Sequence, residues 1–217
     1  MWAYVTDNTI QEIIRFPKSM VINNVRHPRT IFTAWSWTEL NNIGIYTVEP
    51  GTKGDDRFEI TSSPTYAFDS SNKKVTTTYT KTDKALDDAN AKNEDGSDMK
   101  DPITGEQVVN YGLKTLAKEK AKRQAHDLIK RFGWLVQRVT MDSSKTIPSA
   151  VTTYCAAIRT DCADICTAID DAANMTAFKA LYQDIYNYDS DGEITSVKTV
   201  ARVNRWTDDT NVQTYER

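Results

Sequence analysis

The sequence predicts an α+β protein: a small β-rich N-terminal domain, then an antiparallel helical hairpin, then a short C-terminal β-hairpin or tail. Three observations indicate this class. Residues 1–82 hold short, strand-like segments separated by turn residues. Residues 83–112 are acidic and poor in apolar side chains, and we expect an acidic linker or insertion there. Residues 113–186 repeat apolar residues at helical spacing, which leaves residues 187–217 as the tail.

The bulk composition excludes some partners. The chain has 217 residues and a net charge of −3, so its charge gives no case for binding nucleic acid. No apolar run approaches the roughly 18 residues of a membrane span. The first residues lack the basic and apolar regions of a signal peptide. We therefore expect a soluble protein that binds neither nucleic acid nor membranes and is not exported by the common route.

The N-terminal strands are predicted from alternation and turn residues. Asp7-Asn8 lies between two strand-like segments and predicts a tight hairpin turn. The segment "MVINNVRHP" predicts one further short strand ended by Pro28, and "EPGTKGDDR" predicts a loop. The segments "TYAFD" and "VTTTYT", rich in Thr and Tyr, flank "SSNKK" and predict a second hairpin.

The segment "IFTAWSWTELNNIGIYTVE" predicts a short helix that leads into a strand. Ser36 and Glu39 have the spacing of a capping box, in which each side chain satisfies a free backbone N–H. Gly44 supplies the left-handed residue that ends the helix, and "IYTVE" then alternates like a strand. We expect three apolar side chains of this segment to pack against a sheet: Trp35, Trp37 and Leu40.

Two longer helices are predicted in the second half of the chain. The face of the first is formed by Leu113, Ala117, Ala121, Leu128 and Phe132, and Gly133 marks its end. Pro148 starts the second, whose face is formed by Val151, Cys155, Ile158, Cys162, Ile165 and Ile169. Trp134 and Val136, in the connector, are expected to plug the hairpin, and "MTAFKALYQDIYN" predicts a further short helix. The predicted structural core is Leu128, Phe132, Trp134, Tyr154, Ile158, Ile165 and Ile169.

The search for chemistry-bearing motifs gives no enzyme signature. The sequence has no Gly-rich phosphate loop, no G-x-S-x-G, no H-E-x-x-H and no C-x-x-C, so we expect neither catalytic residues nor a cofactor. The three cysteines lack a nearby fourth zinc ligand and are interpreted as packing residues. A lysine stripe at Lys114, Lys118 and Lys122 is interpreted as a solvated helix face, with phosphate binding as the alternative.

The segment "NYDSDGEITSVK" has part of the EF-hand calcium pattern. Acidic and amide residues occupy its early ligand positions and Gly192 its sixth, but Lys198 stands where a bidentate Glu is required. The segment that follows alternates like a strand, so we interpret the whole as a hairpin around an Asp-Gly turn. Weak calcium binding stays open as an alternative, through Asn187, Asp189, Asp191 and Glu193.

Two segments resemble small bacteriophage tail proteins. The first is "IFTAWSWTELNNIGIYTVE", which is similar to a W-S-x-x-E-L-x-x-I-G-I-Y-x-V segment of that family. The second is "RQAHDLIKRFGWLVQRVTMDSSKTIPSAVTTYCAAIRTDC", which is similar to a companion segment of phage tail assembly chaperones and of tail-fibre-associated proteins of marine phages. Phe132-Gly133 and Cys155 depart from the family pattern, and residues 90–110 resemble an insertion. The positions that match in the second segment are Trp134, Arg138, Pro148, Tyr154 and Arg159.

The resemblance implies a structural protein of the virion, made in the host cytoplasm and attached to the tail or its fibres as an adaptor. An assembly chaperone, absent from the mature particle, is the alternative, and a host-surface or glycan-binding module is a third. The expected partners are other phage tail or fibre proteins, with a homo-oligomer in the virion. Docking is expected through the β-rich half, and the interaction candidates are Trp35, Trp37 and Tyr46.

Overall fold

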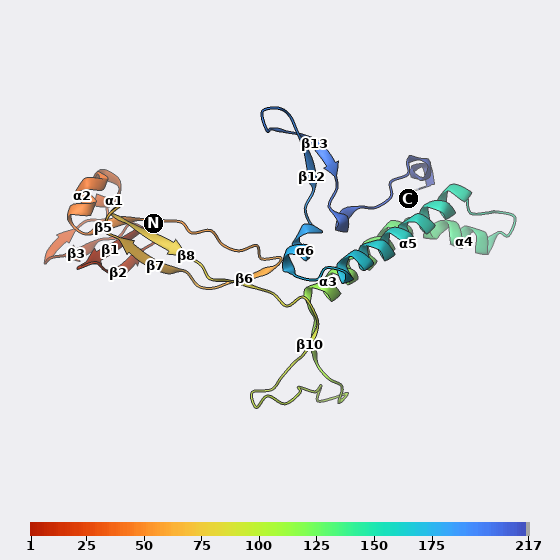
Figure 1. Cartoon of the computed structure of the whole chain (residues 1–217), viewed down its shortest axis with the longest axis horizontal. Helices are drawn as coiled ribbons and strands as arrows, with labels where there is room; N and C mark the ends of the chain where they lie inside the picture. The colour runs from red at the N-terminus through yellow and green to blue at the C-terminus, as the bar shows by residue number, and fades with distance from the viewer. Residues whose placement is uncertain (216–217) are drawn as a thin grey trace. The chain divides into compact units, whose positions relative to one another are not determined.

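The computed structural model describes residues 1–215 and confirms a mixed α+β fold (Figure 1). The chain divides into two compact units, Met1–Asp83 and Lys84–Arg217. The N-terminal unit holds most of the strands, and the C-terminal unit holds the long helices.

The N-terminal unit is built on a five-stranded sheet in the order β2-β1-β5-β8-β7. Neighbouring strands are antiparallel except β5 and β8, which are parallel. The two edge strands, β2 and β7, contact each other, so the sheet is strongly curled. The strands are β1 (Trp2–Thr6), β2 (Thr9–Ile14), β5 (Ile45–Glu49), β7 (Thr65–Asp69) and β8 (Lys74–Thr78).

Both predicted hairpins are confirmed. Asp7 and Asn8 have φ of 50° and 60°, the left-handed pair of a two-residue turn between twisted strands. The β7–β8 turn is held by the carboxylate of Asp69, which accepts hydrogen bonds from the backbone N–H groups of Ser71 and Asn72.

The prediction of a single strand before Pro28 is wrong. The segment folds back on itself as β3 (Met20–Ile22) and β4 (Val25–His27). Asn23 and Asn24 form the turn, with φ of 51° and 63°. Asparagine tolerates this left-handed conformation better than most residues, so Asn-Asn can serve as a hairpin turn without glycine.

The helix predicted in the Trp segment is present as α2 (Trp37–Asn42), and it is preceded by a short helix that the sequence did not predict, α1 (Ile31–Ala34). The capping box is confirmed: the Ser36 N–H donates to Glu39 Oε2 at 2.7 Å, and the Glu39 N–H donates to Ser36 Oγ at 3.3 Å. Gly44 has φ of +82°, and a Cβ there would lie 2.5 Å from the carbonyl oxygen of Val5. Only glycine fits between α2 and β5 without displacing β1.

Each face of the curled sheet buries its own core. The core on the inner face consists of Ala3, Val5, Val48 and Val75. On the other face, the core lies under α1, α2 and the β3–β4 hairpin and consists of Ile14, Ile22, Ile31, Phe32, Leu40 and Ile45. The unit ends in a two-stranded ribbon, β6 (Glu59–Thr61) with β9 (Lys81–Asp83), which the sequence did not predict.

The acidic segment, expected to be a linker or an insertion, has regular backbone pairing. It contains the short pair β10 (Ala89–Asn90) and β11 (Val109–Asn110), extended by two isolated backbone bridges. Its turns are ordered by local side-chain bonds, such as those from the N–H groups of Ile103 and Thr104 to the carboxylate of Asp101. Local turn chemistry, rather than a buried core, gives this segment its structure.

Two long helices pack antiparallel in the C-terminal unit, as predicted. They are α3 (Leu113–Lys130) and α5 (Ser149–Asp170). Lys118 Nζ lies 2.7 Å from Asp170 Oδ1 at one end, and Arg131 Nη2 lies 3.2 Å from Tyr154 Oη at the other. The predicted short helix is α6 (Met175–Ala180), but it stops before the residues that form β12.

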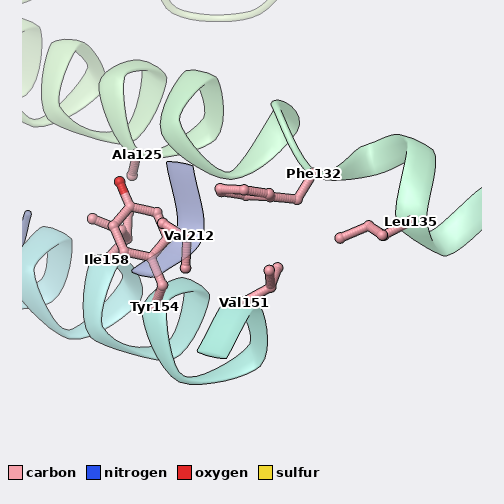
Figure 2. Close-up of a cluster of buried hydrophobic side chains, with 7 residues drawn as sticks. All are labelled: Ala125, Phe132, Leu135, Val151, Tyr154, Ile158 and Val212. Atoms are coloured by element: carbon pink, nitrogen blue, oxygen red, sulfur yellow. The ribbon is translucent and has the colours of Figure 1, made fainter. Parts of the chain in front are cut away.

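The prediction of a connector plugged by Val136 is wrong. Gly133 starts a further helix, α4 (Gly133–Met141), after a break in helical geometry at Phe132. The break shifts the helical phase, so Leu135 is buried while the Val136 side chain is 55% exposed. Figure 2 shows the resulting core between α3, α4 and α5, with Val212 of η2 (Thr210–Tyr215) contributed by the end of the chain. Its members are Ala125, Phe132, Leu135, Val151, Tyr154, Ile158 and Val212.

Between α6 and η2 lie the ribbon formed by β12 (Ile185–Tyr188) and β13 (Ile194–Thr199), then the single turn η1 (Arg202–Asn204). This ribbon extends away from the helices of its unit (Figure 1). We call it the C-terminal ribbon.

Candidate functional site

The three predicted interaction residues do not form one surface. Trp35 is partly buried in the core under the helices, with its ring edge-on to His27 at 5.5 Å. Tyr46 packs on Phe68 at 4.6 Å on the opposite face of the sheet. Trp37 is 56% exposed, so the expectation that it packs against the sheet is wrong. Of the three, Trp37 is the side chain most accessible to a partner.

The residues predicted to form the helical core are brought together in the C-terminal unit. Phe132, Tyr154 and Ile158 are buried in the cluster of Figure 2, and Leu128 and Trp134 pack around it. The Trp134 indole N–H donates to the carbonyl oxygen of Tyr215 at 2.9 Å, which ties η2 to α4. Two further predicted residues are fully buried on α5: Ile165 and Ile169.

One face of the C-terminal ribbon is apolar and exposed. In the ribbon's register Tyr186 pairs with Val197 and Tyr188 with Ile194. One extra residue of β13 lies between Ser196 and Ile194 in this pairing, so the four side chains share a face. The exposed fractions of Tyr188, Ile194 and Val197 are 60%, 58% and 49%. On the other face the polar pair Asn187 and Ser196 lies towards the tip, and Ile185, 56% exposed, lies at the base. The C-terminal ribbon is therefore amphipathic, although no core covers its apolar side.

The base of the C-terminal ribbon is fixed to its unit. The carboxylate of Asp184 accepts a hydrogen bond of 2.6 Å from the N–H of Ala201, which is itself buried. The N–H of Val203 donates to the carbonyl oxygen of Leu181. These bonds join the two ends of the ribbon, so its exposed face has a defined position relative to α6.

The tip of the ribbon is the segment that carried the partial calcium pattern. Asp189 Oδ1 accepts hydrogen bonds from the N–H groups of Asp191 and Glu193, at 3.0 and 2.9 Å, and Gly192 has φ of +83°. This is the hairpin turn that the sequence predicts, and β13 follows where an EF-hand requires a helix. Within residues 1–215 no three or more His, Cys, Asp or Glu side chains are grouped so that they could hold a metal ion.

The helical unit also has an apolar groove of about 270 Å³, lined by residues that include Phe132, Val136 and Val151. The thiol of Cys155 lines the same groove. Burial raises the pKa of the Cys155 thiol, and the nearby Arg159 guanidinium opposes this shift only in part. The thiol is therefore protonated at neutral pH and is a weak nucleophile there.

Sequence reasoning missed the apolar face of the C-terminal ribbon. Tyr186 and Tyr188 alternate in the sequence, but Ile194 and Val197 are three residues apart and share a face only because the strand pairing shifts by one residue between them. Ile194 also matched part of the calcium pattern. Alternation indicates a strand with one apolar face, and it does not tell whether another element covers that face.

Comparisons with protein families, with curated proteins and with solved structures give no match to this chain. None of the helices in the described part of the chain combines the length and apolar character needed to cross a bilayer.

Proposed function

We propose that this chain is a structural protein of a bacteriophage virion, an adaptor that joins one tail or fibre component to another. The observation that supports the adaptor role is the exposed apolar face of the C-terminal ribbon. The proposal that the protein belongs to a phage tail rests on the sequence resemblance of the Trp segment and of the helical segment around Trp134.

An isolated two-stranded ribbon is marginally stable in water, because it has no third strand or helix to cover its apolar face. The C-terminal ribbon leaves Tyr188, Ile194 and Val197 between 49% and 60% exposed. Contiguous apolar surface on a protein typically marks an interaction site. A protein partner that covered this face would bury the three side chains and stabilise the ribbon.

The backbone of the ribbon favours a partner that supplies a strand. The sheet contains only β12 and β13, so the outer edge of each strand is available for pairing. An added strand makes main-chain hydrogen bonds, and alternate side chains of the ribbon give specificity. Tyr188 suits the role of an anchor, since tyrosine combines a large apolar surface with a polar tip. Trp37 offers a second anchor in the N-terminal unit.

Mass spectrometry of purified phage particles tests whether the protein is part of the mature virion. An adaptor is expected in stoichiometric copies in the mature particle. Absence from the particle, together with association in lysates of infected cells, would contradict the adaptor and favour the assembly chaperone.

A pair of variants tests the surface. Val197→Asp places a charge on the apolar face and is expected to abolish co-purification with the tail or fibre partner. Ser196→Asp places the same charge on the polar face, where it can still accept the hydrogen bond from Asn187, and is expected to keep the partner. Equal retention of the partner by both variants would show that the apolar face does not dock.

A further inference from the structure

A polar pocket of about 480 Å³ lies at one end of the curled sheet in the N-terminal unit. The strand registers place the starts of β1 and β7 and the ends of β2, β5 and β8 at this end. Mouths of curled and closed sheets are common ligand sites, because the loops that leave neighbouring strands converge there. Residues before β1, after β2 and β8, in the β5–β6 loop and in β7 thus line one pocket.

The lining of this pocket combines three kinds of group. The first kind is aromatic: one tyrosine ring comes from β7 and one from the residue after β8. The second is cationic, with an arginine that follows β2 and a lysine in the β5–β6 loop. Hydroxyl groups and one carboxylate are the third. These groups include Arg15, Lys53, Asp56, Thr61, Tyr66 and Tyr79. Their composition is unlike the mostly apolar lining of a typical drug-sized site.

The wall formed by the β5–β6 loop lies close to its neighbouring strands. A Cβ at Gly51 would lie 2.3 Å from the carbonyl oxygen of Thr77, and a Cβ at Gly54 would lie 2.5 Å from Glu59 Oε2. The Gly54 N–H donates to Thr61 Oγ1 at 3.1 Å. Two glycines therefore let the loop approach β8 and β6 closely, and these contacts position the loop as a wall of the pocket.

Several polar groups of the pocket have no partner within the described chain. Neither the hydroxyls of Tyr66 and Tyr79 nor the guanidinium of Arg15 makes a hydrogen bond to another group of residues 1–215. The ammonium of Lys53 lies over the Tyr79 ring at 5.8 Å from its centre. Water satisfies these groups in the free protein, and a ligand rich in oxygen atoms can replace that water.

We propose that this pocket binds an acidic sugar. The C–H face of a sugar ring can pack on a tyrosine ring, and its hydroxyls can bond to the free hydroxyls of Tyr66 and Tyr79. Two cations face one carboxylate in the lining, so a ligand that carries a carboxylate is favoured over a neutral one. The guanidinium of Arg15 can hold that carboxylate through two hydrogen bonds. This inference does not depend on the adaptor role, which is argued from the apolar face of the C-terminal ribbon.

Titration of the full-length protein followed by amide NMR tests the proposal. The probes are a trimer of hexuronic acid, a neutral trisaccharide of glucose and inorganic sulfate. The uronate trimer is expected to bind saturably, with a dissociation constant of about 1 mM or lower, and to shift the amides of the β5–β6 loop. The neutral sugar is expected to bind at least roughly tenfold more weakly, because it lacks the charged contact.

Two substitutions of exposed arginines give a matched comparison. Arg15→Gln is expected to weaken uronate binding roughly tenfold, since it removes a charge-assisted hydrogen bond. Arg26→Gln, on β4 and outside the pocket lining, is expected to leave binding unchanged. Unchanged melting temperatures for both variants would show that any loss of binding is local.

Three outcomes would overturn the proposal. The first is no saturable shift with the uronate trimer at about 10 mM, well above the affinity expected of a specific site. The second is equal uronate affinity in the two variants. The third is binding of sulfate as tight as that of the uronate trimer at the same amides, which would reveal a simple anion site that does not recognise sugar.

Discussion

Ile158→Ala is the sharpest test of the helical core. The side chain of Ile158 is 0% exposed and lies among Phe132, Tyr154 and Val212 in the cluster of Figure 2. The substitution removes three carbon groups. At about 0.8 kcal/mol for each buried methylene, the lost burial alone costs about 2.4 kcal/mol.

The cavity left behind adds to this cost. A space of roughly 75 Å³, if it stays open, costs about 1.8 kcal/mol at roughly 24 cal/mol per Å³. The free energy of unfolding is therefore expected to fall by about 2.4 kcal/mol if the neighbours collapse fully and by about 4.2 kcal/mol if they do not.

Urea unfolding followed by circular dichroism at the helical band measures this change, because all the long helices lie in the C-terminal unit. Ile194→Ala is the matched control. It removes the same atoms from a side chain that is 58% exposed, and it is expected to change the free energy of unfolding by less than about 0.5 kcal/mol. Equal costs for the two variants, or a loss below about 1 kcal/mol for Ile158→Ala, would refute the proposed packing of α3 against α5.

Three further predictions concern single positions. Gly44→Ala is expected to destabilise the N-terminal unit by about 1–3 kcal/mol in thermal unfolding, because φ is +82° and the Cβ would meet backbone. Gly96→Ala, with φ of +84° in open space, should cost less, and an equal cost would show that the contact with Val5 is unimportant. Hydrogen bonds from the backbone and the hydroxyl of Ser36 hold the pKa of Glu39 below its ordinary value of 4.5, so the stability it contributes is present above that pH and is lost as the pH falls through the lowered pKa. Unfolding of the wild type and of Glu39→Gln at several pH values should show the difference shrinking in acid, and a difference independent of pH would contradict this reasoning. Calorimetric titration is expected to find no submicromolar calcium site at the tip of the C-terminal ribbon, since a lysine replaces the bidentate glutamate, and tight binding would revive the EF-hand interpretation.

The sequence by itself determined the elements whose signals are local. The capping box of α2, the left-handed Gly44 and the Asp7-Asn8 turn each depend on a backbone conformation within a few residues. Pro148 fixed the start of α5 in the same way. Apolar periodicity over many residues also identified α3 and α5. Each helix must bury its apolar face, and the apolar face of the other helix is close by in the sequence.

Only the tertiary structure decided which of these faces are covered. The parallel pairing of β5 with β8 and the contact between β2 and β7 join residues far apart in sequence, so no local pattern predicts them or the pocket that they form. The break at Phe132 left Val136, which was expected to be buried, exposed and buried Leu135 instead, because a small change in helical phase moves every following side chain. The C-terminal ribbon gathers Tyr188, Ile194 and Val197 on one face through a shift in strand pairing, and this face stays exposed. Alternation along a strand sets which side chains share a face, whereas the cover for that face comes from distant segments or from another chain.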